Sequence, residues 1–339
     1  MQRIVLLVSA ALALVAGPAA AQSVESFYRG KTVTVDVFTG PGGGTDIVAR
    51  LIAQNMGRHI PGNPAMVVKG VLGGGGIVLT NHLYNNAPKD GTELGTINRP
   101  NAFDPLFGLP NTHFDPLKFD WIGSEGKETL LGISWQTSPV KTLLDATKQE
   151  LTVGADAPGA DLSRMPLALN AAVGTRFKVI IGYPSGNEIL LAMERGEVGG
   201  RIGIGYDSLM STRPDWVKTH QVNLLVQMGV TRDSRIPDVP LAIEHAKTPL
   251  DKAVLELVFS PLEMSRPYLL PPGVPPERAA AIRAAFMATM TDPEFVAASG
   301  KAQMSIEPIS GDEILGIIKR AYAQPREVIE RAKAIYAAN

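Results

Sequence analysis

Residues 31–46, KTVTVDVFTGPGGGTD, decide the fold of this chain. Residues 31–38 carry β-branched side chains at period two, which predicts a strand, and the glycine-rich run after them predicts a tight turn. A helical face follows, formed by Ile47, Val48, Leu51, Ile52 and Met56. The stretch therefore predicts a strand, a glycine turn and a helix in that order.

The same unit recurs along the chain. Residues 65–71, 73–76 and 77–86 predict a second strand, glycine turn and helix, and residues 94–97 a third strand. A later series predicts strands at 129–135, 150–155, 177–181 and 223–230, with loops at 156–161 and 183–187. A proline-rich connection at 267–276 precedes helices at 277–290, 292–299 and 312–337. Units of this kind favour an α/β fold with mainly parallel sheets and ligands at the carboxyl ends of the strands.

Composition narrows the class of protein. The 339 residues include 32 Lys and Arg, 33 Asp and Glu, and no Cys. A balanced charge lacks the basic footprint of a nucleic-acid binder, so we expect no nucleic-acid partner. The absence of cysteine excludes disulfides, thiol nucleophiles and cysteine-ligated zinc. The length suggests two domains.

The first 21 residues are typical of a secretory signal peptide. Arg3 precedes an apolar run over residues 4–16, and residues 17–21 end the segment with small side chains. We expect cleavage before Gln22 and export to the periplasm, although an uncleaved membrane anchor is the alternative.

No catalytic or cofactor motif is complete. The five histidines include no pair spaced to bind a metal from one helix, and neither a nucleophile elbow nor a phosphate-binding loop occurs. We therefore expect no enzyme activity, no cofactor, no catalytic residue and no metal site.

The glycine turns carry the strongest chemical signal. A strand that passes through glycines into a helix leaves backbone N–H groups unpaired, and these groups bind small anions such as carboxylates. The alternative is that the glycines only permit tight turns. Arg99 follows the third strand and could hold a carboxylate or remain a surface residue. Asp46 could cap its helix or accept from a ligand, and Tyr183 and Tyr206 could flank a ligand or pack internally.

Several motifs in one order resemble a known family. They are P-G-G-G-T-D at 41–46, the glycine turn at 73–76, A-P-K-D-G-T at 87–92, G-Y-P-S-G-N-E at 182–188, R-D-S-R-I-P-D-V-P at 232–240 and P-P-G-V-P at 271–275. Together with the signal segment they resemble the tripartite tricarboxylate transporter substrate-binding proteins, the Bug or TctC family. Thr39 stands where that family usually has an aromatic residue, and Arg99 and Asp161 add charges where many relatives carry small polar groups.

The resemblance implies a two-lobed, type II-like periplasmic-binding-protein fold. Each lobe would be a mixed, mainly parallel sheet flanked by helices, with a ligand cleft between the lobes that closes like a Venus flytrap. Residues 1–21 would be the signal peptide, 22–100 plus 229–339 lobe 1, and 101–228 lobe 2. The ligand-binding residues that it implies or that the turns suggest are Thr39, Gly40, Gly42, Gly43, Thr45, Asp46, Gly75, Arg99, Ala157, Gly159, Asp161, Ser163, Tyr183, Ser185, Tyr206 and Asp207.

The implied function is a monomeric extracytoplasmic receptor. It would capture a small organic carboxylate and deliver it to TctA/TctB-like permease subunits. A periplasmic sensor and a cleft hydrolase or isomerase are the alternatives. Citrate-like acids, dicarboxylates, aromatic acids and amino acids all stay open as ligands.

Overall fold

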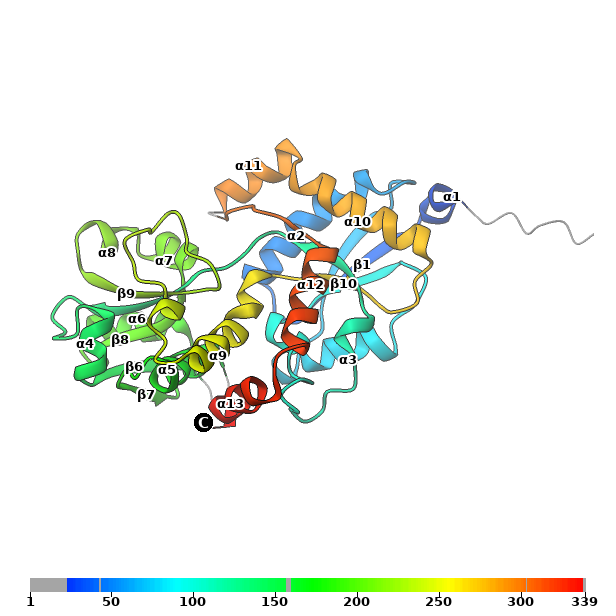
Figure 1. Cartoon of the computed structure of the whole chain (residues 1–339). Helices are drawn as coiled ribbons and strands as arrows, with labels where there is room; N and C mark the ends of the chain where they lie inside the picture. The colour runs from blue at the N-terminus through cyan, green and yellow to red at the C-terminus, as the bar shows by residue number, and fades with distance from the viewer. Residues whose placement is uncertain (1–22, 43, 157–159, 303, 338–339) are drawn as a thin grey trace, which may run out of the picture.

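The chain forms two mixed sheets flanked by helices, as a computed structural model describes it for residues 23–42, 44–156, 160–302 and 304–337 (Figure 1). The predicted α/β class is confirmed. The expected signal peptide lies outside the described residues. Within the described part of the chain, no helix combines the length and apolar character that crossing a membrane requires.

The first sheet has six strands in the order β11-β4-β10-β3-β1-β2. Strand β1 pairs in parallel with both β2 and β3, whereas β10 runs antiparallel between β3 and β4. Its strands are β1 (Thr32–Val37), β2 (Ala65–Gly70), β3 (Glu93–Thr96), β4 (Asp120–Ser124), β10 (Tyr268–Leu270) and β11 (Ile309–Ser310). We call this sheet and its helices lobe 1.

Helices cover both faces of the lobe 1 sheet. Val33, Val35 and Val37 of β1 pack in one buried cluster with residues of α2 and α10, while Leu79 and Leu83 of α3 belong to a second cluster. Figure 1 shows α2 and α10 on one side of β1 and α3 on the other. The helices of this lobe are α1 (Val24–Tyr28), α2 (Gly44–Met56), α3 (Ile77–Asn85), α10 (Pro276–Met290), α11 (Pro293–Lys301), α12 (Gly311–Tyr322) and α13 (Arg326–Ala337), with short 3₁₀ turns η1 (Gly57–His59), η2 (Gly74–Gly76), η3 (Arg99–Ala102) and η4 (Pro116–Lys118).

The second sheet has five strands in the order β7-β6-β8-β5-β9. They are β5 (Leu130–Trp135), β6 (Leu151–Ala155), β7 (Phe177–Ile181), β8 (Gly200–Gly205) and β9 (Val222–Met228). The associated helices are α4 (Leu143–Lys148), α5 (Asp161–Ala172), α6 (Gly186–Glu194), α7 (Tyr206–Thr212), α8 (Pro214–Lys218) and α9 (Pro249–Phe259), with η5 (Ala242–His245) and η6 (Ser260–Glu263). We call this sheet and its helices lobe 2.

The chain crosses between the sheets later than the expected boundaries at residues 100 and 229. Strand β4 belongs to the first sheet, so the outward crossing runs from Ser124 to Leu130. After β9 the chain forms α9, which packs against α5, and it returns to the first sheet only at β10. The two crossing segments are joined by hydrogen bonds from Glu128 N to Leu262 O and from Ser265 N to Gly126 O, both 2.9 Å.

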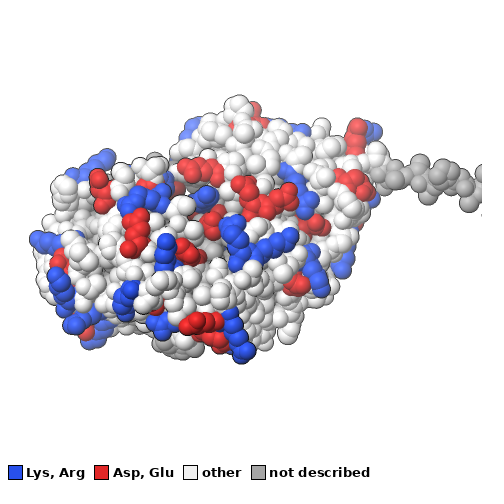
Figure 2. Space-filling model, in the orientation of Figure 1, with Lys and Arg blue, Asp and Glu red and all other residues white. Residues whose placement is uncertain are grey.

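Helix α13 follows the lobe 1 helix α12 along the chain, but it packs against α9 and α5 of lobe 2 (Figure 1). The expected single helix over 312–337 is two helices, because Pro325 lacks the N–H that helix continuation needs. Charged side chains of both signs are interspersed on the face in Figure 2, in keeping with the balanced composition.

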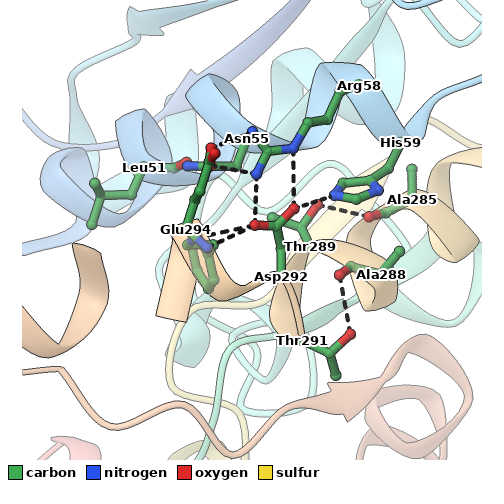
Figure 3. Close-up of polar contacts among 11 residues, drawn as sticks. Leu51, Asn55, Arg58, His59, Ala285, Ala288, Thr289, Thr291, Asp292 and Glu294 are labelled. Carbon is green, nitrogen blue, oxygen red and sulfur yellow. Dashed lines mark hydrogen bonds and ion pairs between the residues drawn. The ribbon is translucent and has the colours of Figure 1, made fainter. Parts of the chain in front are cut away.

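Helix α11 is fixed to η1 through Asp292, which is buried. Arg58 and His59 both contact its carboxylate: Arg58 Nη2 lies 2.6 Å from Oδ1, and His59 Nε2 lies 2.8 Å from Oδ2 (Figure 3). The same carboxylate caps α11 by accepting from the backbone N–H of Glu294. Residues more than 230 positions apart in the sequence therefore meet at this carboxylate.

Candidate ligand cleft

A cavity of about 650 Å³ lies between the lobes. From lobe 1 it is lined by Gly74, Gly75, Ile77, Asn98, Pro100, Asn101, Asp104, Leu109 and Pro110, and from lobe 2 by Asp156, Ala160, Asp161, Leu162 and Arg164. Its volume is in the range that holds a small-molecule ligand.

Two helix N-termini border this cavity from opposite sides. Helix α3 begins after the glycine turn, with Gly76 at φ 100° as its N-cap, and α5 begins after Ala160. Neither cap residue supplies a side chain to the first turn of its helix. The N–H groups and the positive ends of both helix dipoles therefore favour an anion in the cavity.

Arg99 joins the lobes beside the cavity instead of lining it. Its guanidinium pairs with Glu128 on the crossing segment, and its Nη2 lies 3.1 Å from Asp161 Oδ2 at the start of α5. Burial alone would lower the pKa of Arg99, but the charges of Glu128 and Asp161 outweigh burial and raise it. The guanidinium that could have held a ligand carboxylate is thus occupied by carboxylates of the protein.

The cavity carries several charged groups of its own. Asp104 accepts a 2.7 Å hydrogen bond from Asn101, and burial raises its pKa, against the effects of that bond and of the nearby Arg164 charge. Burial lowers the pKa of Arg201 to about 10, against the effect of the Asp156 charge, and Arg201 donates to the carbonyl of Gly186. An occupant therefore meets Arg164 and two helix N-termini as anion-binding groups, and aspartate oxygens as acceptors.

A second cavity of about 80 Å³ shares Glu128 with this ion-pair network. Tyr206 and Asp207 line it, and both are engaged by Arg235: the guanidinium lies 4.4 Å from the Tyr206 ring centroid and 2.6 Å from Asp207 Oδ1. Glu128 lines this smaller cavity and Asp161 the larger one, so Arg99 connects the two sites.

None of the described residues of the first glycine turn, at 40–44, lines the larger cavity. Asp46 accepts from Gly42 N at 2.9 Å and pairs with Arg50, and these hydrogen bonds lower its pKa. These contacts join the carboxylate to the turn before α2 and to the second turn of the helix, which is a structural role. Thr39 has a buried hydroxyl without a hydrogen-bond partner among the described residues, and Gly40 and Thr45 are half-buried.

Three further candidates act within lobe 2. Ser185 caps α6, Ser163 donates to Ala160 O at 3.0 Å, and Tyr183 packs in the buried cluster of this lobe. Gly43, Ala157 and Gly159 lie outside the described residues. The structure thus brings Gly75 and Asp161 into the larger cavity, Arg99 beside it, and Tyr206 and Asp207 into the smaller one.

Sequence reasoning missed most of the polar lining. Asn98, Asn101 and Asp104 lie near Arg99 on the segment after the third strand. Their closeness to Arg99 in the sequence could have identified them as candidates. Arg164 lies three residues after Asp161, so both share a face of α5.

No family model matches the chain. A curated relative, the UPF0065 protein in the TAR-I ttuE-ttuC' intergenic region of Agrobacterium vitis, is 25% identical over 258 residues, which are 74% of this chain and 71% of that protein. A TctC solute-binding protein from Polaromonas has a similar structure, with 18% identity, a TM-score of 0.70, and 92% and 100% of the two chains covered. MatC from Rhodopseudomonas palustris, solved with bound malate, gives 18% identity, a TM-score of 0.62, and 90% and 99% coverage.

Proposed function

We propose that this chain, a member of the Bug or TctC family of solute-binding proteins, is a periplasmic receptor that closes its two lobes on a small organic acid. The observation that carries this proposal is the interlobe cavity bordered by the uncapped N-termini of α3 and α5. Because each lobe supplies one of these helix ends, an anion between them would interact with both lobes only when the lobes are closed.

The lining residues favour an acid that also carries hydrogen-bond donors. Arg164 and the helix N-termini suit a carboxylate, whereas Asp104, Asp156 and Asp161 suit hydroxyl or ammonium groups. The R. palustris structure holds malate, a hydroxylated dicarboxylate. We infer a hydroxy acid or an amino acid as the ligand class.

Export and delivery follow from the same proposal. The signal-like segment would direct the chain to the periplasm, and the closed receptor, as a monomer, would present its ligand to TctA/TctB-like permease subunits. A mixed surface such as that in Figure 2 suits docking through local complementarity more than through one strongly charged field.

A calorimetric and thermal-shift panel tests the ligand class. We would titrate the purified chain with malate, aspartate, succinate and malonamide at fixed pH and salt. A native-state ligand at a hundred times its Kd stabilises by about 2.7 kcal/mol, so a true ligand raises the melting temperature. We expect malate or aspartate to bind, succinate to bind more weakly, and malonamide not to bind. Binding of malonamide but of no acid would contradict the proposal.

A pair of arginine variants locates the binding site. Arg164→Met should weaken acid binding at least about tenfold, because it removes a cavity guanidinium. Arg176→Met is the matched control, since Arg176 is exposed on the same lobe and is not among the lining residues. Equal affinities for both variants would place the ligand elsewhere. Recovery of the ligand chemically unchanged after long incubation would distinguish a receptor from an enzyme.

A further inference from the structure

Asp36 is a buried carboxylate on a strand that is paired on both sides. It lies on β1 between Val35 and Val37, which point to the opposite face, and its side chain is fully buried. Neither carboxylate oxygen has a hydrogen-bond partner within the described part of the chain. A buried charge without hydrogen bonds is costly, so its surroundings indicate what it can bind.

Two further ligand-type side chains converge on this carboxylate from separate elements. His82 on α3 places Nε2 3.9 Å from Asp36 Oδ2 and 2.7 Å from Glu93 Oε1 at the start of β3. One donor atom from each of the three residues lies within 4.8 Å of the others. Gly95, the β3 partner of Asp36, leaves the space that Leu83 of α3 fills, so α3 packs closely against this face.

We propose that Asp36, His82 and Glu93 bind one divalent transition-metal ion, with Zn²⁺ as the best fit. An imidazole nitrogen and carboxylate oxygens are both ligand types that Zn²⁺ binds, and three protein ligands leave a fourth position for water. Ca²⁺ and Mg²⁺ prefer sites made only of oxygen atoms, so the imidazole selects against them. His82 and Glu93 are partly exposed, which gives an ion a route from solvent.

The charges around the site support a cation. Asp36 and Glu93 bring two carboxylates to within 4.8 Å of each other and of His82, so positive charge at this point is in deficit. Lys69, opposite Asp36 on β2, provides only a weak ion pair, because its Nζ is 4.0 Å from Oδ1 and its side chain is 60% exposed. A divalent ion would balance both carboxylates, and Lys69 can turn to solvent.

No local sequence pattern indicates this site, because its three ligands come from a strand, a helix and a second strand. None of them lines the interlobe cavity, so the metal site is spatially separate from the proposed ligand site. Loss of metal binding with intact acid binding, or the reverse, would therefore separate the two proposals.

The test is metal titration of the full chain, produced without a histidine tag and stripped with a chelator. Calorimetry with Zn²⁺ should give one equivalent bound, and Mg²⁺ and Ca²⁺ should not compete at millimolar concentration. His82→Gln and Glu93→Gln should each weaken Zn²⁺ binding at least about tenfold. His59→Gln is the matched control: His59 also contacts a carboxylate, but Arg58 and backbone N–H groups already occupy that carboxylate. No Zn²⁺ binding, or equal binding by all three variants, would overturn the proposal.

Asp36→Asn gives a second measurement that does not depend on affinity alone. The amide has the same shape and no charge, so the metal-free variant should fold and melt at or above the wild-type temperature. Added Zn²⁺ should raise the melting temperature of the wild type and leave this variant unchanged. An equal Zn²⁺-induced rise in both proteins would show that Asp36 is not a ligand.

Discussion

Asp161 Oδ2 lies 3.1 Å from Arg99 Nη2, and the two residues belong to different lobes. The pair stands at the edge of the interlobe cavity, with Arg99 held from its other side by Glu128. In the proposed receptor mechanism, this contact of the protein itself would stabilise the closed lobes in addition to any contact that a ligand makes. The strength of the pair would then set part of the equilibrium between open and closed lobes.

Breaking this pair should open the unliganded protein. Asp161→Asn keeps the size of the side chain and removes its charge, so the closed state loses about 1 kcal/mol. Small-angle scattering should show a larger radius of gyration for the unliganded variant, and acid affinity should fall about fivefold. Asp161→Glu, which keeps the charge, is the control. An unchanged radius in the Asp161→Asn variant would show that the ion pair does not hold the lobes together.

Removing the arginine should affect folding stability as well. Arg99→Met leaves Glu128 and Asp161 close together without their shared cation, and we expect a loss of about 2–3 kcal/mol in the free energy of unfolding. The double variant Arg99→Met with Glu128→Gln should regain about 1 kcal/mol or more, because it removes one unpaired charge. Urea unfolding at neutral pH measures both values. Purely additive losses would mean that Arg99 and Glu128 do not interact energetically.

The local units of the fold follow from the sequence, whereas their assembly does not. Period-two and helical patterns are properties of neighbouring residues, so β1, α2 and α3 were predicted close to where they lie. Strand β10 was expected to be part of a rigid connection, because it has three residues between prolines. Its place between β3 and β4 comes from pairing with distant strands, which no local pattern records.

The candidate ligand cleft also combines features that local sequence predicts with contacts that it does not. The glycine turn at Gly75 and the start of α5 at Asp161 were predicted to face a cleft, and both line the cavity. Arg99 was identified, but its carboxylate partners are 29 and 62 residues away in the sequence, so its ion pairs could not be foreseen. The Asp36 cluster was missed for the same reason.

In the second glycine turn, substitution of Gly76 should lower the folding stability more than substitution of Gly75. Gly76 has φ 100°, and a Cβ there would lie 2.6 Å from Asn101 Oδ1, whereas a Cβ at Gly75, φ 62°, would meet nothing within 4 Å. Gly75→Ala should cost about 1 kcal/mol of stability from backbone strain alone, and Gly76→Ala about 2 kcal/mol or more. Denaturant midpoints of the two variants give the comparison. Equal losses would imply that Asn101 moves aside freely and is not fixed at the cavity wall.

Asp292 should make folding stability depend on pH in the acid range. The hydrogen bonds from Arg58, followed by those from His59 and the backbone N–H of Glu294, hold the pKa of Asp292 well below its usual range. A carboxyl whose pKa is lower in the folded state stabilises the protein above its unfolded pKa of about 3.9, and this contribution disappears as the pH falls through the folded pKa. Asp292→Asn should therefore be less stable than wild type at pH 7.

The difference in folding stability between wild type and Asp292→Asn should be constant from about pH 7 to about pH 5 and should shrink below about pH 4. Melting temperatures or urea midpoints across this range measure it. Glu294→Gln is the control, because Glu294 contacts the same Arg58 but its side chain is 76% exposed, so solvent screens the pair and its removal should change stability little at any pH. A gap between Asp292→Asn and wild type that stays the same or widens toward low pH would mean that the carboxylate is not ionised and held by Arg58 in the folded protein.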